Sequence, residues 1–336
     1  MPSYFHLELQ EQEKIKDYLV AKDLIAASSD VVGIDKAGEG NMNLVLRVTT
    51  QKGSFIIKQS RPWVEKYPQI AAPEGRLLVE AAFYEAAQSL PFVSSHMPDL
   101  LYVDRINRIA QFEDLGTASD FTSVYSNPSA IESHLPELCN WLSALHSGTF
   151  DEHSKQRLIN KEMRTLNHEH IFHFPLLTDN GFDLDAITPG LQAKGDSLKQ
   201  HIRFVDTVTE LGKRYLNAGT NKKDVLLHGD YYPGSWLNTE EGIKIIDPEF
   251  GFFGDSEFDV GVFIAHMLIA GLPETVINTI LDLYKGPHTF APTLALQYAG
   301  VEIMRRLIGV AQLPLTANLE TKASLIDQAR RLVLTP

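Results

Sequence analysis

The first part of the chain alternates between two rhythms of hydrophobic and polar residues. Apolar residues recur at helical spacing over residues 8–27 and again over residues 74–89, which predicts two amphipathic helices. Between them the period shortens to two, over residues 44–49 and 54–59. The four residues Thr50-Gln51-Lys52-Gly53 separate these two runs and predict the turn of a β-hairpin.

The same patterns suggest how the whole chain is organised. A further β-rich stretch covers residues 100–115, and the remainder is mainly helical except over residues 224–247, where a second hairpin is expected. A sheet-rich first third followed by a helical remainder predicts an α+β fold with two lobes and a cleft between them. We place the lobes at residues 1–116 and 117–336.

Composition narrows the range of partners. The chain has 336 residues, with 30 Lys and Arg against 43 Asp and Glu, so its net charge of −13 argues against non-specific binding to nucleic acid. The one cysteine, Cys139, excludes an internal disulfide and a thiolate metal cluster, which fits a reducing cytosol. The N-terminal residues show no apolar signal core, and the longest apolar run, Val260–Leu272, is too short to span a bilayer. We therefore expect a cytoplasmic protein without a membrane or nucleic-acid partner.

The candidate chemistry begins with two aspartates. Asp230 ends a His-Gly-Asp triplet in a loop after an apolar strand, and Asp247 closes the hairpin that follows. Pairing of that hairpin is expected to bring both carboxylates to the same end, where they would suit Mg²⁺. Asp230 could then orient a hydroxyl group and accept its proton. The alternative is that Asp230 is a turn residue and Asp247 a strand-end cap.

Two upstream features fit phosphate binding. Gly38, Gly40 and Asn41 lie between β segments, where their backbone amides could approach phosphates, although two glycines also suit an ordinary turn. Lys58 lies in an apolar strand, where a cation needs a partner, and Glu80 on the following helix could supply it. The alternative is a lysine at the rim of the sheet.

These residues resemble the aminoglycoside phosphotransferase and choline kinase group, small-molecule relatives of protein kinases, and within it most closely the 5-methylthioribose kinases. The match extends over most of the chain, and Ser235 stands at a position where many relatives have Asn and methylthioribose kinases have Ser. The matching segments are GEGNMN at 38–43, KQSRPWV at 58–64, HGD at 228–230, DPEFGFFGDSEFDVG at 247–261 and MRRLIG at 304–309.

The resemblance implies a two-lobed protein-kinase-like fold that binds ATP. The N-terminal lobe would contain an antiparallel sheet and a helix, and the C-terminal lobe would be mainly helical with a small hairpin at the catalytic loop. Asp230 would be the catalytic base, and Asp247 and Glu249 would bind Mg²⁺ together with the hydroxyl of Ser235. Lys58 would contact the phosphates.

The resemblance also implies the remaining contacts. The connector at Glu113 and Leu115 would offer backbone groups to adenine, and Trp63, Arg305 and Arg306 would lie near the sugar or its transferred phosphate. Without the resemblance, Trp63 would be interpreted as a core aromatic residue and both arginines as surface or salt-bridged residues. Relatives in this group are often homodimers, so a homodimer is also expected.

Three functional hypotheses follow. The first is an ATP- and Mg²⁺-dependent kinase of methylthioribose or a related thiosugar. The second changes the acceptor to an aminoglycoside, choline, homoserine or another sugar, because Tyr231-Tyr232 and the short loop after Trp63 depart from the family pattern on the acceptor side. The third is a catalytically inactive nucleotide-binding module. Arg305 and Arg306 separate the first two hypotheses, since paired arginines would repel a cationic acceptor.

Overall fold

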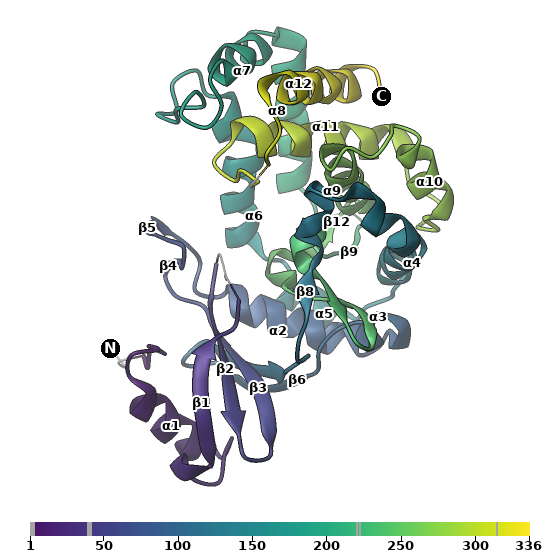
Figure 1. Cartoon of the computed structure of the whole chain (residues 1–336). Coiled ribbons are helices and arrows are strands. Elements are labelled where there is room, and N and C mark those ends of the chain that lie inside the picture. The colour runs from purple at the N-terminus through teal and green to yellow at the C-terminus, as the bar shows by residue number, and fades with distance from the viewer. Residues whose placement is uncertain (1–3, 39–41, 220, 222, 314) are drawn as a thin grey trace. The chain divides into compact units, whose positions relative to one another are not determined.

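The chain forms two compact units in the computed structural model (Figure 1). Unit 1 contains Met1–Ala118 and Thr239–Glu249, and unit 2 contains Ser119–Asn238 and Phe250–Pro336. The first break lies close to the boundary expected from sequence, which did not assign the short second segment to the first unit. The structure describes residues 4–38, 42–219, 221, 223–313 and 315–336.

Unit 1 is built on a five-stranded antiparallel sheet in the order β1-β2-β3-β7-β6. The predicted hairpin is confirmed, with register from Leu44↔Gln59 to Thr50↔Gly53. Alternate side chains of β2, such as Leu46 and Val48, are fully buried in the core, as the period of two requires. The strands of the sheet are β1 (Val31–Lys36), β2 (Leu44–Thr50), β3 (Gly53–Gln59), β6 (Leu100–Asp104) and β7 (Ile109–Glu113).

The first helix is shorter than the predicted 8–27. Helix α1 covers Gln12–Ala21 and ends because Asp23 adopts a left-handed conformation, with φ 57°. The amide of Leu24 then donates to the carbonyl of Leu19 at 2.9 Å, which closes a Schellman-type cap. Glycine usually occupies this position at the end of a helix. Because an aspartate stands here, the sequence does not show where the helix ends.

Helix α2 (Arg76–Ala87) confirms the second predicted helix and supplies side chains to the candidate site. Its buried residues include Arg76 and Glu80, which lie one helical turn apart and so project from the same face. The other elements that begin in unit 1 are η1 (Ser28–Asp30), β4 (Trp63–Val64), β5 (Tyr67–Ala71), α3 (Pro91–Ser95), β11 (Gly242–Ile245) and η7 (Pro248–Phe250).

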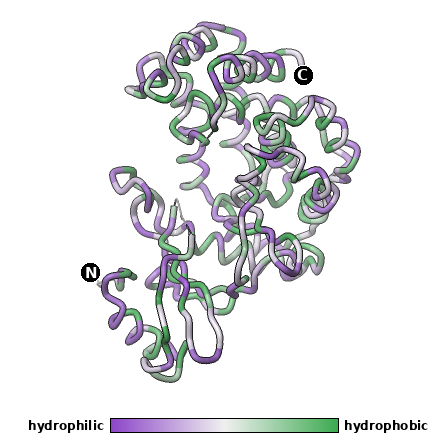
Figure 2. Tube along the Cα trace, in the orientation of Figure 1, coloured by the Kyte–Doolittle hydropathy of each residue, from purple (hydrophilic) through white to green (hydrophobic). Residues whose placement is uncertain are grey.

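Unit 2 is mainly helical and has α9 at its centre. All residues of α9 (Ser256–Ile269) are buried, and α11 (Pro292–Ile308) packs against it. The close approach requires Gly261, because a Cβ there would lie 2.6 Å from the carbonyl oxygen of Ala295. Figure 2 shows hydrophobic and hydrophilic segments alternating along the outer helices, as expected where only one face is buried. The other helices are η2 (Phe121–Tyr125), η3 (Pro128–His134), α4 (Leu135–His146), α5 (Glu152–Arg157), α6 (Lys161–His168), the π-helix η4 (Glu169–His173), η5 (Phe174–Leu176), α7 (Leu191–Lys199), α8 (Ile202–Leu216), η6 (Pro233–Ser235), α10 (Val276–Leu283) and α12 (Leu319–Leu334).

Short strands frame the segment that carries the two candidate aspartates. The β-rich stretch expected over residues 224–247 is confirmed as β9 (Val225–Leu227), β10 (Trp236–Thr239) and β11. Strand β10 pairs with β8 (Ser119–Asp120), and β9 pairs with β12 (Phe252–Gly254). The sequence analysis did not predict β12, because three consecutive buried residues show no alternation. Within the described ranges, no helix combines the length and apolar character needed to cross a bilayer.

Candidate active site

Unit 1 contains a buried cluster of charges around Lys58. Lys58 lies on β3, and only 4% of its surface is exposed. Its Nζ is 2.8 Å from Glu80 Oε1 and 2.7 Å from Asp247 Oδ1. The predicted partnership of Lys58 with Glu80 is therefore present, and Asp247 joins it as a second carboxylate on the same ammonium group.

The pKa directions in this cluster follow from burial and the surrounding charges. Burial lowers the pKa of Lys58, but Asp247, Glu80 and Glu249 raise it more, so the ammonium group stays protonated. Burial raises the pKa of the Glu80 carboxyl, Asp247 and Glu249 raise it further, and Lys58 opposes them. Lys58 is therefore held firmly as a cation, and the repulsion between neighbouring carboxylates favours the protonated form of Glu80.

Glu249 is held by two residues to which the sequence analysis gave no role. Its Oε2 accepts a hydrogen bond from Asn43 Nδ2 at 2.8 Å and lies 3.4 Å from Arg76 Nε. Arg76, whose side chain is fully buried, also donates from Nε to Asn43 Oδ1 at 2.8 Å. The remaining hydrogen bonds of Arg76 go to the carbonyl oxygens of Met42, Arg61, Trp63 and Pro73. The one sequence signal for Arg76 is its spacing of four residues before Glu80.

The residues around Asp247 fit a hydrated magnesium ion. Asp247 has φ 62°, a strained conformation for a residue other than glycine, and 49% of its side chain is exposed. Three carboxylates, those of Glu80, Asp247 and Glu249, face the two cations Lys58 and Arg76, so the cluster has an excess of acid. Among the described residues, no group of three or more His, Cys, Asp or Glu could hold a metal by itself. Mg²⁺ does not require one, because it commonly takes one or two carboxylates and completes its shell with phosphate and water.

The predicted phosphate loop is only partly described. Gly38 has φ 76°, which glycine adopts without strain. Gly40 and Asn41 lie outside the described residues.

The predicted adenine connector is anchored at both of its ends. The amide of Glu113, the last residue of β7, donates to the carbonyl of Asp99 at 2.9 Å. Leu115 follows, half-buried, between two residues that are both bound by Arg47. Arg47 makes a bidentate ion pair with Asp114 at 2.8 and 2.9 Å, and it donates to the carbonyl of Gly116 at 2.8 Å. This anchoring fixes the backbone of the connector.

Trp63 is half-buried on β4 rather than enclosed in the core. Its ring lies against His6, with centroids 6.3 Å apart, and the Arg61 guanidinium lies 5.8 Å from its centroid. Its carbonyl accepts a hydrogen bond from Arg76 at 3.2 Å. Arg76 therefore connects the backbone at Trp63 with Glu249.

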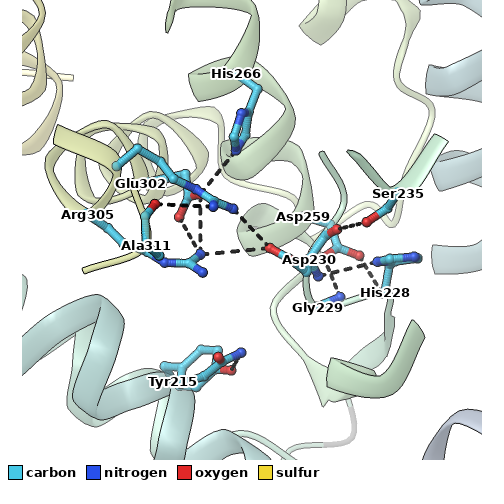
Figure 3. A network of polar contacts seen from close by, with 12 residues as sticks. Tyr215, His228, Gly229, Asp230, Ser235, Asp259, His266, Glu302, Arg305 and Ala311 are labelled. Carbon is cyan, nitrogen blue, oxygen red and sulfur yellow. Dashed lines mark hydrogen bonds and ion pairs between the residues drawn. The ribbon is translucent and has the colours of Figure 1, made fainter. Parts of the chain in front are cut away.

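Unit 2 holds Asp230 by its backbone. Asp259, fully buried on α9, accepts hydrogen bonds from the amides of His228 and Gly229 at 2.7 and 3.0 Å (Figure 3). Gly229 has φ 84°, and a Cβ there would lie 2.3 Å from the carbonyl oxygen of Phe250, so only glycine fits. The His-Gly part of the triplet therefore fixes the loop that presents Asp230.

A buried histidine supports Asp259 in turn. His146 Nε2 is 3.3 Å from Asp259 Oδ2, and its Nδ1 is 2.7 Å from the Tyr284 hydroxyl. Each ring nitrogen of His146 therefore has a partner, as a buried polar side chain requires.

Two arginines on α11 meet the carboxylate of Asp230, and Figure 3 labels Arg305 of this pair. Arg306 Nη2 is 3.3 Å from Asp230 Oδ1, and Arg305 Nη1 is 3.8 Å from the same oxygen. Glu302 balances the pair, with 3.0 Å to Arg305 Nη1 and 2.6 Å to Arg306 Nε. The Arg306 guanidinium also lies 4.8 Å from the ring centroid of Tyr232, a cation–π contact.

The two arginines differ in how fully they are bound. Every nitrogen of Arg306 has a partner, because Nη1 donates to the carbonyl of Ala311 at 3.4 Å. Arg305 is also buried, but its Nε has no hydrogen-bond partner among the described residues. Both side chains are salt-bridged, as the alternative interpretation expected, and Arg305 retains a donor.

Ser235 and Tyr231 have internal roles in unit 2. The Ser235 hydroxyl is buried and donates to the carbonyl of Asp230 at 2.9 Å. Tyr231 is fully buried and stacks on Trp141, with centroids 5.4 Å apart and an interplanar angle of 4°. The tyrosine that departs from the family pattern directly after Asp230 is therefore part of the core.

The structure thus gathers the predicted residues into two groups. Unit 1 brings together Lys58, Glu80, Asp247 and Glu249, and unit 2 brings together Asp230, Ser235, Arg305 and Arg306. The expected meeting of Asp230 with Asp247 remains a prediction.

No family model matches the chain, but comparison with curated proteins finds methylthioribose kinases among its relatives. It is 27% identical to the methylthioribose kinase of Exiguobacterium sibiricum, over 87% of this chain and 82% of that protein. It is 28% identical to the methylthioribose kinase of Geobacillus sp. strain WCH70, over 88% of this chain and 82% of that protein.

Comparison with solved structures identifies the fold. The choline kinase LicA from Streptococcus pneumoniae aligns with a TM-score of 0.57 and 13% identity, over 97% of this chain and all of that chain. The spectinomycin phosphotransferase APH(9)-Ia aligns with a TM-score of 0.53 and 16% identity, over 96% and 97% of the two chains. The chain is therefore similar in sequence to curated methylthioribose kinases, and it has an α+β fold like that of the choline kinase and spectinomycin phosphotransferase structures.

Proposed function

We propose that this protein is an ATP- and Mg²⁺-dependent kinase that phosphorylates a hydroxyl group of methylthioribose or a related thiosugar. The observation that carries the proposal is the setting of Asp230. Its backbone is fixed through Asp259, and its carboxylate is held by Arg305 and Arg306. Similarity to methylthioribose kinases over most of the chain supports the choice of acceptor.

Asp230 is the proposed base for the acceptor hydroxyl. As the hydroxyl oxygen forms its bond to the γ-phosphorus of ATP, the bond to the β-phosphate oxygen breaks and ADP leaves. The hydroxyl proton passes to the carboxylate of Asp230. Arg306 holds one oxygen of that carboxylate and so restricts its orientation.

Unit 1 supplies the proposed contacts to the nucleotide phosphates. Lys58, held by Glu80, binds phosphate oxygens as a buried cation. Asp247 and Glu249 would hold Mg²⁺, and the Ser235 oxygen, which keeps its lone pairs while donating to Asp230, is the third predicted ligand. The bound ion neutralises phosphate charge.

The other nucleotide contacts are assigned to the backbone. The amides at Gly38, Gly40 and Asn41 would approach the phosphates, as their place between two strands predicts. The connector at Glu113 and Leu115 would offer backbone groups to adenine, and its anchoring by Arg47 supports this assignment.

The arginine pair favours a neutral acceptor with hydroxyl groups. The Arg305 side chain is 10% exposed, so its guanidinium group can donate to a hydroxyl oxygen, and the half-buried ring of Trp63 suits the apolar part of a thiosugar. A choline or aminoglycoside would place its own positive charge near two guanidinium groups. We therefore rank cationic acceptors below sugars.

A coupled ADP-release screen over thiosugars, pentoses, amino alcohols and aminoglycosides tests the proposal. We expect one preferred thiosugar, with no transfer to cationic alcohols. Preference for a cationic alcohol would contradict the proposed acceptor but would agree with the proposed phosphoryl transfer. Binding of ATP without transfer to any member of the panel would identify an inactive nucleotide-binding module.

The expected assembly and location belong to the same proposal. The cytoplasmic location is supported by the single cysteine, which is buried and unpaired. The homodimer is supported by the resemblance, and light scattering of the purified chain tests it.

A further inference from the structure

A buried chain of polar side chains reaches the arginine pair from residues that the proposed reaction does not use. His266 on α9 is fully buried, and its Nε2 is 3.1 Å from Glu302 Oε1 (Figure 3). Its Nδ1 is 2.5 Å from the Tyr125 hydroxyl. Glu302 contacts Arg306 Nε at 2.6 Å, and Arg306 Nη2 contacts Asp230 Oδ1 at 3.3 Å. Four consecutive contacts therefore connect Tyr125 with Asp230.

The chemistry of the partners determines which nitrogen of His266 carries the hydrogen. Burial raises the pKa of Glu302, but Arg305 and Arg306 hold it well below its ordinary range, so this carboxylate is ionised. An ionised carboxylate only accepts hydrogen bonds, so His266 Nε2 must donate. Its Nδ1 then presents a lone pair and accepts the hydrogen of the Tyr125 hydroxyl. Burial lowers the pKa of His266 to about 4, which keeps the ring neutral at physiological pH.

The hydrogen bond from His266 fixes Glu302 without changing the local charge. Glu302 Oε1 accepts from His266 at 3.1 Å, from Arg305 at 3.3 Å and from Arg306 at 2.6 Å. Each arginine contacts Asp230 as well as Glu302, so the arginines can shift between the two acids. The two arginines alone could therefore hold the Glu302 carboxylate in more than one orientation. A neutral donor on a rigid, buried helix removes that freedom.

We propose that His266, oriented by Tyr125, is a positioning residue for phosphoryl transfer, because it fixes the carboxylate of Glu302 so that Arg306 stays against Asp230. The kinetic part of this inference rests on the proposed function. The competing explanation is that His266 only fills space in α9, where every side chain is buried.

Matched variants separate positioning from packing. His266→Leu removes the donor, His266→Gln keeps an N–H group that can reach Glu302, and Leu268→Ala is a control that disturbs the same buried helix elsewhere. We expect His266→Leu to lower kcat at least about tenfold with the KM for ATP changed less than about twofold. His266→Gln should return kcat to within about threefold of the wild type, and Leu268→Ala should lower the Tm while leaving kcat unchanged.

A milder variant guards against loss of folding. Tyr125→Phe keeps the ring and removes the hydroxyl, so we expect a fall in kcat of about two- to fivefold with little change in the Tm. Unchanged kcat in both Tyr125→Phe and His266→Leu would overturn the proposal.

An NMR readout tests the positioning without any turnover. The Nε–H of Arg306, buried against Glu302, should give a slowly exchanging ¹H–¹⁵N signal in the wild type and in His266→Gln. The signal should be lost in His266→Leu and kept in Leu268→Ala. Retention in His266→Leu would show that His266 acts by packing alone. A wild type that transfers no phosphate would refute the proposed function, and this signal alone would then decide whether His266 positions Arg306.

Discussion

The charged clusters of the two units are built in different ways. In unit 1, Lys58 is paired directly with two carboxylates, and the whole cluster has three acids against two cations. In unit 2, Asp230 and Glu302 face Arg305 and Arg306, so the acids and cations balance. The first cluster therefore has room for an added cation, whereas the second is neutral before any ligand arrives.

This difference matches the two partners of a kinase reaction. An acid excess beside a buried lysine suits a metal that accompanies the nucleotide phosphates. A balanced cluster around one aspartate suits a neutral alcohol, whose proton must leave without a large change in local charge. Unit 2 also has an outer layer of support, since Asp259 and Glu302 each contact a buried histidine that meets a tyrosine hydroxyl.

The largest effect should follow from removing the proposed base in unit 2. Asp230→Asn keeps the size of the side chain but not its basicity, so we expect kcat to fall by at least about 100-fold. Nucleotide affinity, measured by calorimetry, should change little. Asp327→Asn, at an exposed position on α12, is the matched control. Near wild-type turnover in Asp230→Asn would remove this residue from its role.

A smaller effect should follow from weakening the acid excess in unit 1. Asp247→Asn leaves Lys58 paired with Glu80 but removes one carboxylate from the predicted metal site. We expect the Mg²⁺ concentration needed for half-maximal activity to rise at least about tenfold, because few protein carboxylates hold this ion. Magnesium titration of the initial rate measures the shift. An unchanged midpoint would place the metal elsewhere.

The two arginines should separate binding from chemistry. Arg305→Lys keeps the positive charge but removes the planar guanidinium group of a partly exposed side chain, so we expect the KM for the acceptor to rise about tenfold with kcat little changed. Arg306→Lys disturbs the contact with Asp230, so kcat should fall instead. Steady-state kinetics with both substrates varied distinguishes these patterns, and identical profiles for the two variants would show that the pair acts as one unit.

A last prediction concerns stability in mild acid. The pKa of His266 is about 4 in the folded state, against an ordinary 6.5, so between these values only the unfolded chain binds the proton. The free energy of unfolding should therefore fall as the pH drops, by about 1.4 kcal/mol per pH unit from this group. The charged and titratable groups that face His266 are Tyr125, Asp230, Tyr232, Glu302 and Arg306.

Urea unfolding of the wild type and His266→Gln between pH 4.5 and 7 measures this contribution. The stability difference between the two proteins should be constant above pH 6.5 and change steadily below it, because all other groups are shared. A constant difference would mean that His266 is not held neutral.

Local patterns predicted the elements that position the site. The alternation in β2 and β3 and the turn between them appear as expected, and so does α2 with Glu80 directed at Lys58. These features depend on neighbours in sequence, which a periodic pattern reflects directly. The end of α1 was missed because Asp23 takes a conformation that usually signals glycine.

The polar supports could not be predicted in the same way. Asn43 and Arg76 reach Glu249 across separations of about 200 and 170 residues. Tyr125, His266 and Glu302 come from η2, α9 and α11, and each would be acceptable alone as an ordinary core residue. Such contacts depend on tertiary packing, so no local sequence pattern predicts them.

The most direct test of the central claim is ³¹P NMR of a reaction containing the protein, ATP, Mg²⁺ and methylthioribose. We predict loss of the γ-phosphate signal and growth of a phosphate ester on the anomeric oxygen of the sugar, with Asp230→Asn giving neither within the same time. Persistence of ATP, or release of inorganic phosphate alone, would contradict the account.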